Sequence, residues 1–187
     1  MARSVVQDWG RMEHVWYFAY GSNMQAATFG GRRGITPTSA RAVRVPGWRL
    51  VLDKPPLLGP GSGFANIVAE DGAEVFGVAY EIAMDDLAHV ELTEGVTLGN
   101  YRRAEVTTVP LDPAHPPCTA FTLVTDKRDA TLLPSAHYMG LLIEGAEAFG
   151  LPAAWIAFLR GHPTGVDTPE TAAARARVEG LLAQLRR

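Results

Sequence analysis

The turn Tyr20-Gly21-Ser22-Asn23 is the first place where this chain could bind a small anion. It directly follows a compact aromatic run. Gly21 allows a sharp backbone turn, and successive backbone N–H groups in such a turn can point at one anion. This pattern predicts a site for a carboxylate. An ordinary strand-to-helix turn, with Ser22 or Asn23 as the helix N-cap, explains the same residues equally well.

Glu94, within the sequence ELTEGV, is the second candidate. It directly precedes Gly95, at the point where a short helix is expected to end. The helix dipole disfavours negative charge at that end, and a carboxyl group kept there suits general acid or base chemistry near neutral pH. The alternative is a solvated surface glutamate, which is the more common fate of this residue type.

Tyr138, in the sequence PSAHY, is the third candidate. Ser135 is suited to cap the helix that begins here, and Tyr138 would then project its hydroxyl group inward. That hydroxyl could contact a ligand. A buried tyrosine that fills the core and finds any hydrogen-bond partner is an equally good reading of the residue type.

The composition excludes several other kinds of site. A formal net charge of −3 gives no general attraction to nucleic acid. The five histidines are scattered, and the single cysteine, Cys118, can form neither an intrachain disulfide nor a thiolate cluster, so we expect no metal site. Motifs for dinucleotides, nucleoside triphosphates and serine hydrolases are absent, and we expect no cofactor.

Two further features concern location. No apolar run reaches the roughly 18 residues that a membrane span needs. Charged residues interrupt residues 1–14, which therefore lack the apolar segment of a secretory signal. We expect a cytoplasmic protein with no membrane association.

The elements that must position these residues form one domain, because 187 residues is a typical domain length. Aromatic and β-branched runs predict strands, and turn residues predict their connections. Pro46-Gly47 predicts a hairpin within residues 39–52, and Asp71-Gly72 predicts a second one. The predicted strands are residues 15–20, 64–69, 74–82, 101–110 and 118–125.

Helical spacing appears in four segments. We predict a short helix over residues 84–92 and two helices after Pro134, separated by Gly150-Leu151-Pro152. The tail, residues 169–187, has an apolar stripe that could pack onto its own domain or form a homodimer contact. That stripe comprises Val178, Leu181, Leu182 and Leu185. Residues 54–63 are too rich in Pro and Gly for a regular element.

In this order, the motifs resemble those of the γ-glutamylcyclotransferase family and its AIG2-like relatives. The resemblance covers residues 15–159. It rests on YFAYGSN at 17–23, EVFGVAY at 74–80, EGVTLGNY at 94–101, PSAHY at 134–138 and GAEAFGLP at 145–152.

The resemblance implies an α+β fold: a single domain with a mixed, mostly antiparallel, barrel-like sheet flanked by helices and a cavity at the barrel mouth. We expect this domain at residues 15–162, with a leader at 1–14 and a helical extension at 163–187. The leader, the loop at 54–63 and the tail have no clear family counterpart.

The resemblance also implies chemistry. Family members let the α-amine of a γ-glutamyl substrate attack its own γ-carbonyl, which releases 5-oxoproline and a free amine or amino acid without water or cofactor. Glu94 matches the catalytic glutamate and would act as general acid and base. The expected substrate-binding residues are Tyr17, Tyr20, Gly21, Ser22, Asn23, Tyr101 and Tyr138.

Two alternatives stay open at this point. The same reaction could act on a γ-glutamyl amine or on a carrier-bound biosynthetic intermediate. A non-catalytic module on the same fold could instead bind a small metabolite.

Overall fold

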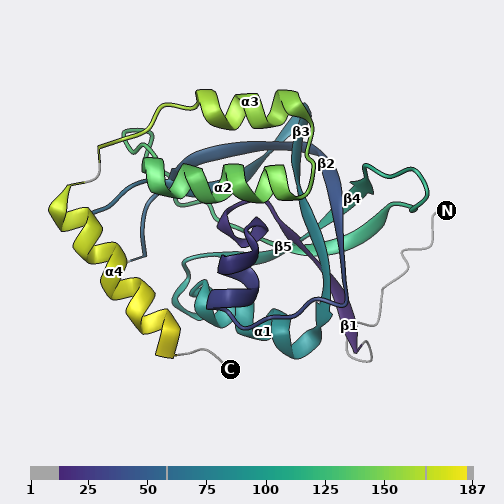
Figure 1. Cartoon of the computed structure of the whole chain (residues 1–187), viewed down its shortest axis with the longest axis horizontal. Coiled ribbons are helices and arrows are strands. Elements are labelled where there is room, and N and C mark those ends of the chain that lie inside the picture. The colour runs from purple at the N-terminus through teal and green to yellow at the C-terminus, as the bar shows by residue number, and fades with distance from the viewer. Residues whose placement is uncertain (1–12, 58, 167, 185–187) are drawn as a thin grey trace.

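A closed β-barrel forms the centre of the computed structural model, which describes residues 13–57, 59–166 and 168–184. The strands follow one another around the barrel in the order β1, β3, β2, β4, β5 (Figure 1). The fold class expected from the resemblance is confirmed. The strands are β1 His14–Ala19, β2 Ser39–Lys54, β3 Phe64–Ala83, β4 Arg102–Pro110 and β5 Cys118–Val124.

Both predicted hairpins are wrong, because each predicted turn lies inside one long strand. β2 and β3 pair antiparallel from Ser39 opposite Glu81 to Lys54 opposite Phe64. The register steps from Pro46 opposite Glu74 to Trp48 opposite Ala69, so residues 70–73 form a wide bulge opposite Gly47. Positive φ angles at Gly47 and Gly72 allow this bulge.

The helices are found where helical spacing predicted them. They are α1 Met84–Thr93, α2 Ala136–Ala148, α3 Ala153–Gly161 and α4 Pro169–Gln184. Ser135 caps α2 as expected, since its side chain accepts a hydrogen bond from the Tyr138 backbone N at 3.1 Å. Figure 1 shows α2 and α3 side by side on one side of the barrel, with α1 on another.

The two ends of the chain leave two predictions open. The leader lies almost entirely outside the described residues. The tail is helical, but the side chains of its apolar stripe lie outside the described residues, so the homodimer contact stays a prediction. No described helix is long and apolar enough to cross a membrane.

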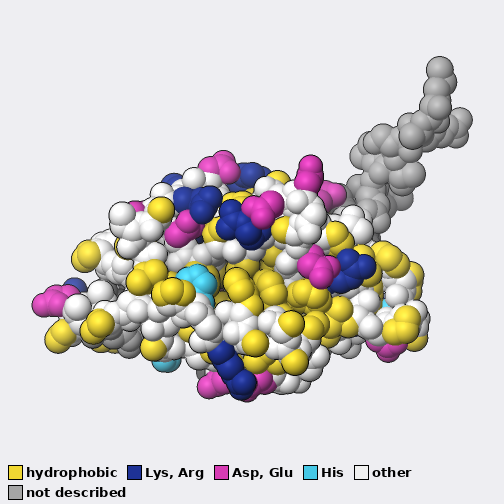
Figure 2. All heavy atoms as spheres, turned by 90° about the horizontal axis from the view of Figure 1, so that it is seen from above, with side chains coloured by type: hydrophobic (Ala, Val, Ile, Leu, Met, Phe, Trp, Pro, Cys, Tyr) yellow, Lys and Arg dark blue, Asp and Glu magenta, His cyan; other side chains and the backbone are white. Residues whose placement is uncertain are grey.

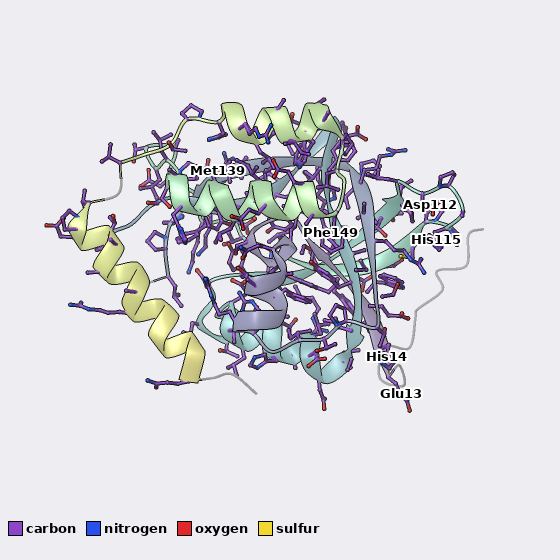
Figure 3. All side chains as sticks on the ribbon, in the orientation of Figure 1. Glu13, His14, Asp112, His115, Met139 and Phe149 are labelled. Carbon is purple, nitrogen blue, oxygen red and sulfur yellow. The ribbon has the colours of Figure 1, made fainter. Side chains whose placement is uncertain are left out.

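The packing of α2 against the barrel fixes the segment after the turn at residues 20–23. A Cβ atom added to Gly145 of α2 would lie 2.6 Å from the Cβ of Met24, which no real pair of side chains tolerates. Met139 and Phe149 lie near opposite ends of the same helix (Figure 3). The Phe149 ring meets the Tyr80 ring edge-on at 5.8 Å, and Met139 is buried. The close contact between Gly145 and Met24 therefore leaves room for glycine only at position 145.

Candidate active site

Glu94 is the residue at which α1 ends. Its backbone N still bonds to the Val90 oxygen at 2.9 Å, whereas Gly95 adopts a left-handed conformation with φ +74 and stops the helix. Asn100 then folds back, and its Nδ2 donates to the main-chain oxygen of Glu94 at 2.8 Å. The expected position of Glu94 at a helix C-terminus is confirmed.

Two residues from the first part of the chain bond to the Glu94 carboxylate and a third bonds to one of them; we call Tyr17, Asn23 and Arg33 the carboxylate cluster. Asn23 Nδ2 lies 3.2 Å from Glu94 Oε1, and Arg33 forms an ion pair with the same oxygen. Asn23 also donates to the Tyr17 hydroxyl at 2.9 Å and accepts from Arg33 Nε at 2.8 Å. The Glu94 side chain is 23% exposed, so it is not a freely solvated surface glutamate.

The turn at residues 20–23 differs from the simple interpretations of its sequence. No side chain caps the short 3-10 helix Ser22–Met24, so the N-cap interpretation is wrong. Gly21 has a φ of −118, so a left-handed backbone is not what requires glycine. A Cβ atom there would lie 3.1 Å from the Tyr138 hydroxyl and 3.3 Å from the Ala65 Cβ. A side chain at this position would therefore require these close neighbours to shift.

Two tyrosines converge on the backbone of Ala65 in β3. The Tyr138 hydroxyl accepts a hydrogen bond from the Ala65 N at 3.1 Å, and the Tyr101 hydroxyl donates to the Ala65 O at 3.0 Å. Burial raises the pKa of Tyr138, against the hydrogen bonds from Ala65 and Ser22 that lower it. Burial also raises the pKa of Tyr101. Both hydroxyls therefore keep their protons at neutral pH and serve as neutral hydrogen-bonding groups.

Tyr17 lies in β1 and Tyr20 directly follows that strand, and their hydroxyl groups have different partners. The Tyr17 ring stacks on Phe29 at 5.8 Å, and its hydroxyl belongs to the carboxylate cluster. The Tyr20 hydroxyl instead donates to the main-chain oxygen of Leu123 in β5. Burial raises the pKa of both tyrosines. Tyr20 thus links two strands of the barrel, and its predicted contact with substrate stays a prediction.

Sequence reasoning missed three residues beside Glu94. Arg33 belongs to the carboxylate cluster, while Lys54 and Asn100 form, with Tyr101, what we call the carbonyl cluster. Lys54 Nζ donates to Asn100 Oδ1 at 2.5 Å. Burial lowers the pKa of Lys54 to about 8, although the charge on Glu94 acts in the opposite direction. Lys54 stands before two prolines and Arg33 follows two glycines and Arg32, and neither context signals a site.

Two surface hollows lie away from Glu94. The larger, about 460 Å³, lies between β2, residues 128–133 and α3. Figure 2 views the molecule from the side of α3 and shows hydrophobic side chains gathered across that face, where Phe158 is 46% exposed. The smaller one is lined by Asp112 and His115 of the loop after β4 (Figure 3). Within the described ranges, no three His, Cys, Asp or Glu side chains form a group suited to a metal ion.

Comparison with protein families gives a match to the AIG2-like family over residues 74–159, a range that includes Glu94 and Tyr138. The chain is also 34% identical, over 176 residues, to the γ-glutamyl cyclotransferase aclK of Aspergillus oryzae. That match covers 84% of this chain and 64% of the relative, so the chain spans less than two thirds of the length of this curated relative.

Solved structures share the fold. An uncharacterized protein from Homo sapiens aligns with a TM-score of 0.74 at 24% identity, covering 91% of this chain and 99% of the human chain. A structure named γ-glutamyl cyclotransferase aligns with a TM-score of 0.71 at 24% identity, covering 88% of this chain and 99% of its own. At this level of identity, both likenesses show a shared fold.

Proposed function

We propose, from the premise that this chain belongs to the AIG2-like family of γ-glutamyl cyclotransferases, that it is itself a cyclotransferase for small γ-glutamyl compounds. The observation that carries the proposal is the Glu94 carboxylate, partly exposed at the end of α1 and bonded to Asn23 and Arg33. This arrangement joins the turn at residues 20–23 to the residue that matches the family's catalytic glutamate.

The reaction moves two protons from the attacking nitrogen to the leaving nitrogen. The α-ammonium of the substrate loses one proton, the free amine attacks the γ-carbonyl carbon, and the same nitrogen loses a second proton as it becomes the lactam N–H. The amide bond to the leaving nitrogen breaks as that nitrogen takes up one proton, and the released amine takes up the other to become an ammonium. The products are 5-oxoproline and a free amine or amino acid, and atoms balance without water.

Glu94 has the geometry for both proton transfers. Its Oε1 is engaged by Arg33 and Asn23, and no described residue donates a hydrogen bond to its Oε2. Oε2 can therefore accept the proton of the α-ammonium and return it to the leaving nitrogen. Arg33 and Asn23 hold the carboxylate in one orientation during both transfers.

The remaining predicted residues bind the substrate. We propose that backbone N–H groups of the turn at residues 20–23 bind the α-carboxylate or the oxyanion of the attacked carbonyl. Tyr138, whose hydroxyl lies against Gly21, contacts the substrate from α2, and Tyr101 lines the cavity. The absence of an intrachain disulfide, with Cys118 as the sole cysteine, supports our prediction of a cytoplasmic location.

The test is product formation from a substrate panel. Purified protein is incubated with γ-glutamyl dipeptides, γ-glutamyl amines and glutathione, and 5-oxoproline is followed by mass spectrometry. We expect product from the wild type and about 10²- to 10⁴-fold less from Glu94→Gln. The matched control is Glu91→Gln on the same helix, because Glu91 pairs with Arg103 and not with the site. A folded wild type that binds these compounds without forming product would support a binding module instead.

A further inference from the structure

Lys54 is a buried lysine at the end of β2, and nothing in the reaction described above uses it. Its exposed fraction is 2%. The ammonium lies 4.7 Å from the centre of the Tyr101 ring and 5.8 Å from the centre of the Phe64 ring. The ammonium donates one hydrogen bond, to Asn100 Oδ1 at 2.5 Å, and forms no other hydrogen bond with the described residues.

The charge on Lys54 lacks a direct counter-ion. Within the part of the chain that the structure describes, no carboxylate lies at ion-pair distance from its Nζ. A buried charge is costly unless an opposite charge or several hydrogen bonds compensate it. Two aromatic rings and one amide oxygen compensate an ammonium only in part. Arg33, by contrast, has the Glu94 carboxylate as its partner.

Two hydrogen bonds through the Asn100 side chain also connect Lys54 to Glu94. The amide of Asn100 receives the Lys54 hydrogen bond and donates to the main-chain oxygen of Glu94. The loop that follows Lys54 also lies close to Glu94. A Cβ atom on Gly95, the residue after Glu94, would lie 3.0 Å from Leu57 Cδ2 of this loop. An unpaired cation therefore lies beside Glu94, next to the half-buried rings of Phe64 and Tyr101.

We propose that Lys54 is a specificity-determining residue, which binds a carboxylate on the leaving portion of the substrate so that γ-glutamyl amino acids and peptides are preferred to γ-glutamyl amines. The proposal rests on the proposed function. It concerns the part of the substrate that differs between these classes. A leaving amino acid carries a carboxylate close to the nitrogen that is released, and a leaving amine carries none.

The charges account for this preference. The γ-glutamyl group always carries one carboxylate, which we assign to the turn at residues 20–23. An α-amino acid as the leaving group adds a second carboxylate, which supplies the counter-ion that Lys54 lacks. An uncharged alkyl group would leave the buried ammonium uncompensated in the complex.

The experiment compares γ-glutamyl-alanine with γ-glutamyl-ethylamide, which differ only by the leaving carboxylate. We expect the wild type to prefer γ-glutamyl-alanine about 10- to 100-fold in kcat/KM, the range for a hydrogen bond to a charged group. In Lys54→Met this ratio should fall to near one. The matched control is Lys127→Met, which removes the same charge from an exposed position and should keep the wild-type ratio. A wild-type ratio near one, or an unchanged ratio in Lys54→Met, would overturn the proposal.

A binding measurement separates this proposal from the cyclotransferase reaction. Calorimetry with γ-glutamyl-alanine uses the Glu94→Gln variant with and without Lys54→Met. At pH 8, in buffers of different ionisation enthalpy, binding should be coupled to proton uptake only where Lys54 is present, because a bound carboxylate favours the ammonium form. Uptake and a Lys54-dependent affinity without turnover in the wild type would refute the reaction and keep the specificity site. Equal affinity in both variants would refute the site, whatever the turnover.

Discussion

The two clusters around Glu94 differ in how completely their charges are paired. In the carboxylate cluster, the Arg33 guanidinium bonds to Glu94, Asn23 and Thr93, and the Asn23 amide uses both its oxygen and its nitrogen. In the carbonyl cluster, the Lys54 ammonium has one amide oxygen and two aromatic rings. Both contain a buried cation, but among the residues that the structure describes only Arg33 has a carboxylate at ion-pair distance.

This difference indicates which part of the site is complete without substrate. The carboxylate cluster holds Glu94, our proposed general acid and base, in place before anything binds, which is what preorganised catalysis requires. The carbonyl cluster keeps a charge that costs stability until an anion arrives. Functional sites often carry such a cost. Arg33 therefore stabilises the fold, whereas Lys54 serves recognition at the expense of stability.

The largest expected effect is that of Arg33→Met. The substitution leaves the partly buried Glu94 carboxylate and the Asn23 oxygen without their strongest donor. We expect the free energy of unfolding to fall by about 3 kcal/mol, the lower end for a broken buried ion pair. Urea unfolding measures this change. Arg44→Met is the control, because its pair with Glu74 is 40% and 42% exposed and should contribute about 0.5 kcal/mol or less. Similar losses in the two variants would contradict the comparison.

The pH dependence of stability tests the carbonyl cluster. Burial lowers the pKa of Lys54 from 10.5 to about 8, so between these values the unfolded chain binds more protons than the folded one. The cost is fully present below pH 8 and is lost as the pH rises to 10.5. Relative to Lys54→Met, the wild type should gain about 3 kcal/mol across this window. Unfolding curves at pH 7, 9 and 10.5 would refute this if wild type and variant ran parallel.

A third prediction gives Lys54 the partner that it lacks. Asn100→Asp places a carboxylate where Asn100 Oδ1 lies 2.5 Å from the ammonium. The new ion pair should compete with a substrate carboxylate and reduce the preference for γ-glutamyl-alanine over γ-glutamyl-ethylamide about tenfold. Asn100→Ala loses the same bond to the Glu94 oxygen without adding charge. It should keep the preference, and a similar drop in both variants would argue against competition for Lys54.

The smallest effect comes from single hydroxyl groups. Tyr138→Phe removes the hydrogen bonds that its hydroxyl forms with Ala65 and Ser22, and Tyr20→Phe removes the one to the Leu123 main chain; each substitution should cost about 1 kcal/mol of stability. We expect KM to rise about fivefold in Tyr138→Phe alone, because its hydroxyl lies against Gly21 while that of Tyr20 links β1 to β5. Thermal unfolding and initial rates measure the two quantities. A KM change in Tyr20→Phe as well would place Tyr20 in the substrate site.

The sequence predicted those site residues that have a local signal. Glu94 precedes a helix-ending glycine, the turn at residues 20–23 follows an aromatic strand, and Tyr138 follows a capping serine. Arg33 and Lys54 have no such signal, since only the folded chain brings these distant positions to one glutamate. Asn100 lies six residues after Glu94, but its hydrogen bond to the Glu94 main chain depends on the turn between them. A buried lysine beside two prolines looks in sequence like an ordinary loop residue.

Prediction of the fold from the sequence has the same limit. Strand and helix positions followed from residue types and spacing, because these act over a few residues. The turn at Asp71-Gly72 did not become a hairpin, because pairing with β2 extends on both sides of it and a bulge accommodates the extra residues. Local turn chemistry was outweighed by contacts between strands distant in sequence.

The barrel closes only when its first strand, β1, pairs with its last strand, β5. The site therefore cannot be completed during synthesis until the ribosome has made β5. β1 pairs with β5 at Tyr17 and Phe121, and Thr122 Oγ1 donates to the Phe18 O at 2.9 Å. A nascent chain that has reached Pro117 contains Glu94 and the turn at residues 20–23. It still leaves one edge of β1 unpaired, and such edges promote aggregation. The strand leading into the turn at residues 20–23 gains its second neighbour only when the ribosome has delivered β5, and contacts this distant in sequence fold slowly.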